Sequence, residues 1–177
     1  AIDAAIAAAE VLTVVYPHNV ALGGDLIALV RTPDGDVRCI NASGWTATGV
    51  DADALRARYG RSLPLRGVDT VTVPGGVRGW EALRRFGARL TWDRTLQPAQ
   101  ESAAGAPVAQ SLASNIVESG DLVGNDDFDR VFRPSGQPLQ VGDELKQPAL
   151  ALTFGTLAAE GPDAFYAGEL ADRTVEF

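Results

Sequence analysis

The first residues of the chain carry a helical pattern of apolar positions. Apolar side chains recur at three- and four-residue steps, at Ile2, Ile6, Ala9, Leu12 and Val15. This spacing places them on one face of a helix, and the intervening alanines allow close packing on the other faces. Pro17 ends the pattern, because the residue before a proline avoids helical backbone. We therefore predict a buried helix over residues 1–16.

A β-hairpin is predicted next. Residues 26–31 (LIALVR) are dense in apolar and β-branched side chains, which is typical of a strand buried on both faces. Residues 33–36 (PDGD) carry a turn signal. Residues 37–41 then alternate in polarity, so we expect them to pair back as the second strand.

The rest of the chain is mostly helical in pattern. Asp51 or Asp53 caps a short helix through Tyr59, with Gly60 as its stop. Further helices are expected over residues 79–87, 92–104, 148–159 and 163–176. Residues 107–118 form an amphipathic stretch, and residues 70–73 a brief extended run. Irregular connections are expected at 124–128 and 133–145. This is a helix-rich α/β layout with only two or three strands. Because so little sheet cannot cover so many helices, we expect residues 1–177 to be a single partial domain, incomplete at both ends.

Composition excludes several classes of function. The chain has 46% apolar and 21% charged residues and a formal net charge of -8. A nucleic-acid surface needs clustered Lys and Arg, so no nucleic-acid partner is expected. The longest apolar stretch is interrupted by Asp3 and Glu10 and is shorter than the roughly 20 residues of a membrane span. It also lacks the basic start of a signal peptide, and the compartment is left open.

Cys39 is the only cysteine and His18 the only histidine. No disulfide forms within the chain, and no Cys-rich metal site is available. A zinc site or a Ser-His-Asp triad would depend entirely on His18, which we interpret as a structural side chain beside Pro17. We therefore expect no metal and no cofactor, and chemistry that works largely without imidazole.

Two glycine-rich segments are candidates for anion binding. Gly23 and Gly24 precede a strand, which is the reverse of a dinucleotide fingerprint, and we favour a packing role over an anion cradle. In VPGGVRGWEAL, Arg78 and several glycines stand where a helix begins, and helix N-termini favour anions. No phosphate-specific spacing surrounds Arg78, so the packing interpretation is favoured there too.

Two polar segments are further candidates. The segment NASGWTATG (41–49) follows the second predicted strand. Its short polar side chains, Asn41, Ser43 and Thr46, suit ligand orientation, and Trp45 suits a pocket wall, although a plain turn has the same composition. Asp126, Asp127 and Asp129 suggest a cation, but the order does not fit an EF-hand loop, and we favour a solvated turn.

Taken in order, these segments resemble one family. AIDAAIAAA (1–9), PHNVALGGDLIALV (17–30), NASGW (41–45), VPGGVRGWEALRRFG (73–87) and LQPA (96–99) are similar to the large subunit of the gamma-glutamyltransferase (gamma-glutamyltranspeptidase) family. The run GQPLQVGDELKQPALALTFGTLAAEGPDAFYAGELA (136–171) resembles the family's next block. The resemblance covers nearly all of the chain.

This resemblance implies an αββα N-terminal-nucleophile hydrolase made as a self-cleaving precursor. In the family, cleavage exposes a threonine at the start of a small subunit. That threonine attacks a gamma-glutamyl amide, and the acyl group passes to water or to an amino acid. Its own α-amine, whose pKa is about 8, serves as the base, so no imidazole is needed. The implied partners are a small subunit from the same precursor and a small-molecule amide, with further oligomerisation open.

Two departures from the family pattern matter. The chain begins with Ala1 and contains no processing threonine at its start, so we expect no catalytic residue in it, and place the nucleophile on another segment. The resemblance also places a carboxylate-gripping arginine at position 43 or 45, where this chain has Ser43 or Trp45. Asn41, Ser43 and Trp45 are the predicted substrate-binding residues, and glutathione is a doubtful substrate without that cation.

Three hypotheses follow. The first is the large-subunit portion of a gamma-glutamyltransferase-like enzyme of glutathione or related metabolism. The second is an acylase acting on a non-glutamyl amide. The third is a non-catalytic relative that serves as a binding or scaffold protein; a free-standing anion-binding domain is weaker, because it would have to fold with so little sheet.

Overall fold

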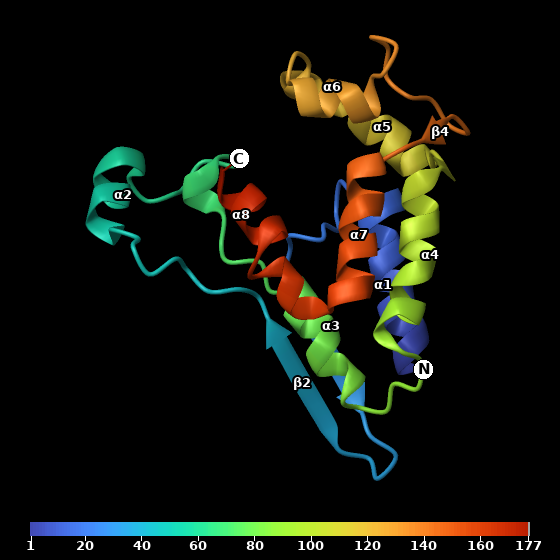
Figure 1. Cartoon of the computed structure of the whole chain (residues 1–177). Coiled ribbons are helices and arrows are strands. Elements are labelled where there is room, and N and C mark those ends of the chain that lie inside the picture. The colour runs from blue at the N-terminus through green and yellow to red at the C-terminus, as the bar shows by residue number, and fades with distance from the viewer. Residues whose placement is uncertain (177) are drawn as a thin grey trace.

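The computed structural model describes residues 1–176 (Figure 1). Its helices are α1 (Ile2–Val15), α2 (Ala52–Tyr59), α3 (Gly76–Arg84), α4 (Trp92–Ala104), α5 (Gln110–Glu118), α6 (Asp126–Phe132), α7 (Pro148–Glu160) and α8 (Glu169–Glu176), and short 3₁₀ turns occupy Val68–Thr70 (η1), Gly120–Leu122 (η2) and Pro162–Phe165 (η3). The strands are β1 (Leu26–Arg31), β2 (Val37–Ala42), β3 (Ala106–Pro107) and β4 (Glu144–Leu145).

The core is a bundle of α1, α4 and α7, which run side by side in Figure 1. Its fully buried apolar side chains include Ile6, Val14, Leu96, Phe154 and Leu157. The indole Nε1–H of Trp92 donates to the carbonyl of Leu157 at 2.7 Å, which ties the start of α4 to α7. The predicted buried helix at the N-terminus is therefore confirmed, although Leu12, placed on its buried stripe, is 41% exposed.

The predicted hairpin is also confirmed. β1 and β2 pair antiparallel from Leu26 opposite Ala42 to Arg31 opposite Val37. One face packs on α3 and the helical core, because Gly79 lets that helix approach Leu26 closely. The prediction that β1 is buried on both faces is wrong. In the part of the chain that the structure describes, nothing covers the other face, so its apolar side chains are open to solvent.

A second, smaller cluster forms around α5, α6 and the β3–β4 pair. Buried side chains of α5 and β4 meet there, and Phe128 and Phe132 of α6 pack against them. The expectation of an irregular connection at 124–128 is wrong, because Asn125 caps a helix. Its side-chain oxygen accepts from the backbone N–H groups of Asp127 and Phe128, and this cap starts α6.

The segment from residue 45 to residue 75 leaves the body and carries α2, which stands apart in Figure 1. Of the two predicted caps of α2, Asp51 is the one that the structure shows. The expected extended run at 70–73 forms no strand, although the Val73 N–H donates to the Trp45 carbonyl at 2.9 Å. The helix expected over 163–176 is two pieces, η3 and α8, because Gly168 has a φ of 90° and breaks the helical path.

Candidate functional site

A cavity of about 730 Å³ opens where β2 ends and α3 begins. Three parts of the chain line it: residues within 40–48, residues within 73–82, and Tyr166 after η3. Its size lies in the range of small-molecule sites. The cavity therefore joins the NASGW segment, the start of the VPGGVRGW helix and Tyr166 of the run 136–171, which are far apart in the sequence.

Close backbone contact shapes this cavity. Gly44 has a φ of 68°, and a Cβ there would collide with the Val73 carbonyl oxygen. A Cβ on Gly75 would collide with the carbonyl oxygen of Ala42. Since only glycine avoids both problems, the two glycines hold the segment after β2 against the residues that enter α3.

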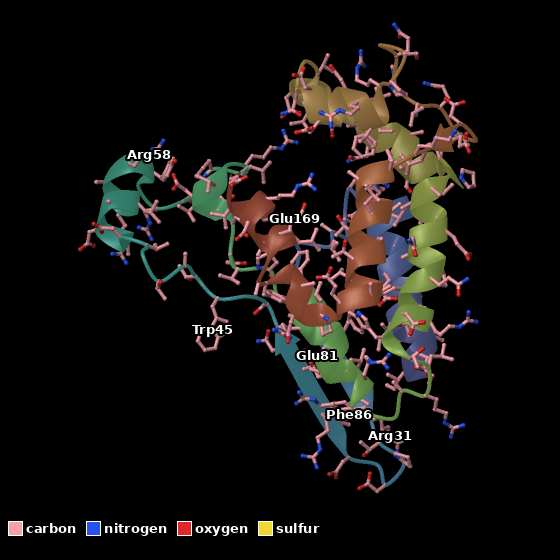
Figure 2. All side chains as sticks on the ribbon, viewed as in Figure 1. Arg31, Trp45, Arg58, Glu81, Phe86 and Glu169 are labelled. Atoms are coloured by element: carbon pink, nitrogen blue, oxygen red, sulfur yellow. The ribbon has the colours of Figure 1, made fainter. Side chains whose placement is uncertain are left out.

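The structure brings two of the three predicted substrate-binding residues to this cavity. Asn41 and Trp45 line it, whereas Ser43 does not. The Asn41 Oδ1 accepts a hydrogen bond from the Ser43 backbone N–H at 3.1 Å, so Ser43 helps to form the turn that orients Asn41. Trp45 is 85% exposed, and Figure 2 shows it projecting away from the helices.

Two further residues of the site were not assigned to it from the sequence. The Arg78 backbone N–H donates to the Tyr166 hydroxyl at 3.2 Å, and its guanidinium carbon lies 4.8 Å from the Tyr166 ring centre. The pKa of Tyr166 is raised, chiefly by desolvation. The sequence makes Arg78 an anion-binding candidate, but nothing local in it links Arg78 to Tyr166 or to Asn41.

The other candidates lie elsewhere. The Gly24 carbonyl accepts from the Gly76 N–H at 2.8 Å at the start of α3, which is the packing role favoured for the glycine pair. His18 lies 4.2 Å, centre to centre, from the Tyr16 ring and lines a separate small cavity with Phe128 and Phe132.

The aspartate cluster belongs to α6, in the smaller cluster around α5, α6 and the β3–β4 pair. Asp127 pairs with Arg130 and Asp129 with Arg133, and Asp126 belongs to the capped first turn of α6. Throughout residues 1–176, no three acidic, histidine or cysteine side chains are grouped to hold a metal ion. None of the helices within those residues is long and apolar enough to cross a membrane.

Comparison with known proteins decides the family. A family model described as gamma-glutamyltranspeptidase matches residues 1–177. The chain belongs to this family. A glutathione hydrolase-like proenzyme of Bacillus subtilis is 34% identical over 99% of this chain and 34% of its own length. Oxamate amidohydrolase proenzyme of Klebsiella pneumoniae is 38% identical, again over 99% of this chain and 34% of its own length.

Solved structures agree. The cephalosporin acylase of Bacillus halodurans superposes with a TM-score of 0.89 and 35% identity, over 98% of this chain and 34% of that chain. The expected fold class, a helix-rich part of the αββα N-terminal-nucleophile hydrolases with a central hairpin, is thus confirmed. The chain spans about a third of the length of these three relatives.

Proposed function

We propose that this chain is the large-subunit portion of a gamma-glutamyltransferase-like enzyme. It forms one wall of the acyl-donor pocket, and an N-terminal threonine on another segment attacks the amide. The described lining of the cavity supports this division. It includes Thr46 and Thr48 but no carboxylate or imidazole to activate their hydroxyls, so a nucleophile that carries its own amine suits the site.

One observation carries the proposal: the uncovered apolar face of the β1–β2 hairpin. On it, Ile27 is 69% exposed, Leu29 74% and Val37 64%. A sheet in a sandwich packs its apolar face on a second layer, and an open apolar face of this kind indicates a missing partner. The relatives are named as proenzymes, which suits a second segment from the same precursor as that layer.

A second candidate is an acylase that acts on a non-glutamyl amide. Neither residue at the expected arginine position carries a charge: Trp45 lines the cavity, and Ser43 forms the turn beside it. One relative is a cephalosporin acylase. A non-catalytic relative, which binds an amide without cleaving it, is the third. The three candidates differ in whether the full-length gene product cleaves itself and in which amides it hydrolyses.

The test is intact-mass measurement and N-terminal sequencing of the purified full-length gene product. We expect two chains, the smaller beginning with threonine, and hydrolysis of a gamma-glutamyl or simple acyl anilide. Cleavage with activity on acyl but not gamma-glutamyl anilides would select the acylase. A single chain that stays uncut on prolonged incubation would overturn the enzyme proposal and favour the non-catalytic relative.

A further inference from the structure

The cavity beside Asn41 has a simple distribution of charge. Among the described side chains that line it, Arg78 is the one that carries a formal charge. The remaining walls are apolar side chains, backbone and the neutral polar groups of Asn41, Thr46, Thr48 and Tyr166. A ligand that enters therefore meets one positive charge in an otherwise neutral site.

Neighbouring groups hold the guanidinium of Arg78 in place. It lies over the Tyr166 ring, its Nη2 is 2.6 Å from the Asp163 Oδ1, and its Nη1 is 2.9 Å from the Glu81 Oε2. An arginine held this way loses little conformational entropy when it binds a ligand. Nε–H and the second hydrogens of Nη1 and Nη2 have no partner in these two contacts.

The ion pairs with Asp163 and Glu81 leave Arg78 able to bind a ligand. The Asp163 side chain is 81% exposed, and an ion pair with so exposed a carboxylate is weak because water competes for both charges. A ligand carboxylate can instead make charge-assisted hydrogen bonds to the Nε–H and the unused Nη hydrogens of Arg78. The exposed Asp163 is thus a weak competitor for this arginine.

We propose that Arg78 binds the carboxylate of the amide donor and selects acyl donors that carry one. This assignment rests on the proposed amide-cleaving function. Asn41, which also lines the cavity, contributes a second contact: its Oδ1 is engaged by the Ser43 N–H, which leaves its NH₂ group to donate to a ligand. The cation therefore comes from the first turn of α3 rather than from position 43 or 45.

The experiment measures kcat/KM of the full-length enzyme and its Arg78→Gln variant on three anilides. Gamma-glutamyl anilide has both the α-amine and the α-carboxylate, glutaryl anilide lacks the amine, and 4-aminobutanoyl anilide lacks the carboxylate. We expect Arg78→Gln to lower kcat/KM about 10- to 100-fold on the first two, mainly through KM, and less than about threefold on the third. Equal losses on all three, or no loss, would overturn the proposal.

Arg58→Gln is the matched control. Arg58 pairs with Asp69 at 2.9 Å and its guanidinium carbon lies 4.9 Å from the Tyr59 ring centre, which repeats the Arg78 arrangement on α2, away from α3 (Figure 2). It should leave all three rates unchanged. Self-cleavage and thermal unfolding of both variants show whether they fold.

A binding measurement separates this proposal from the proposed function. If the wild-type protein cleaves none of the anilides, calorimetry with glutamine, which keeps the α-carboxylate, and with 4-aminobutanamide, which has no carboxylate, still applies. Binding of glutamine that Arg78→Gln abolishes, with weaker binding of 4-aminobutanamide, would support the Arg78 site although the enzyme proposal had failed. No glutamine binding, or binding that survives the substitution, would overturn it.

Discussion

Leu29 and Cys39 lie directly opposite each other in the β1–β2 hairpin, and both side chains are exposed on its outer face. The same face carries Ile27, which pairs with Asn41 at the edge of the cavity. Whatever covers this face therefore also comes next to the cavity. A covering second segment would both bury the apolar side chains and complete the site.

The reactivity of the Cys39 thiol tests whether a second segment covers the outer face of the hairpin. In the 177-residue chain, we expect Cys39 to react with a thiol reagent at the rate of a solvent-exposed cysteine. In the processed full-length protein it should react at least about tenfold more slowly, because the second segment shields it. Mass mapping of the labelled peptide gives both rates. Equal labelling of the two proteins would show that the hairpin face stays open.

The effect of a Leu29 substitution on the free energy of unfolding tests whether the same face is covered. Leu29→Lys should change the stability of the 177-residue chain by about 0.5 kcal/mol or less, since the side chain is 74% exposed there. In the full-length protein it would bury an unpaired charge and cost about 3 kcal/mol or more. Urea unfolding of both proteins measures the difference. Ile40→Lys, on the inner face, is the control and should destabilise both alike.

The close approach at the cavity can be tested at Gly75. A Cβ there would collide with the backbone oxygen of Ala42, so Gly75→Ala should cost about 1–3 kcal/mol and raise KM by moving the pocket wall. Gly49→Ala is the matched control, because no atom lies within 4 Å of its Cβ position. Denaturant unfolding and kcat/KM should separate the two. A neutral Gly75→Ala would mean that the segment after β2 is free to move.

Local pattern was enough to predict much of the fold. Periodicity predicts the helix at the N-terminus, a turn signal between two strand patterns predicts the hairpin, and residue type narrows the cap of α2 to Asp51 or Asp53. The error on β1 has a physical reason. A continuous apolar run favours a strand that is covered on both faces. It does not say whether the layer that covers each face lies within residues 1–176.

The site was only partly predictable. Residue type makes Asn41 and Trp45 candidates, the family resemblance assigns them to substrate binding, and the structure places both at the cavity. The contact between Arg78 and Tyr166 joins residues 88 positions apart, and no period or motif in one sequence reports such a pairing. Likewise, Glu10 interrupts an apolar pattern and was interpreted as a break in hydrophobicity, whereas it is fully buried in the core.

That buried carboxyl predicts the pH dependence of stability. Glu10 has no hydrogen-bond partner for either side-chain oxygen among the described residues, and desolvation raises its pKa from 4.5 to about 8, although Arg84 opposes the shift. Between these values the folded state holds a proton that the unfolded state has lost. The free energy of unfolding should therefore fall by up to about 1.4 kcal/mol per pH unit as the pH rises from 4.5 towards 8, and the loss is complete above 8.

Glu10→Gln removes the titrating group and keeps its size. We expect the variant to lose this slope and to be more stable than the wild type at pH 8, while the two converge below about pH 4.5. Urea unfolding at half-unit steps of pH measures both curves, and Glu118→Gln, at an exposed glutamate on α5, should follow the wild type. Parallel curves for Glu10→Gln and wild type would show that the folded protein keeps Glu10 charged, through contact with Arg84 or with water.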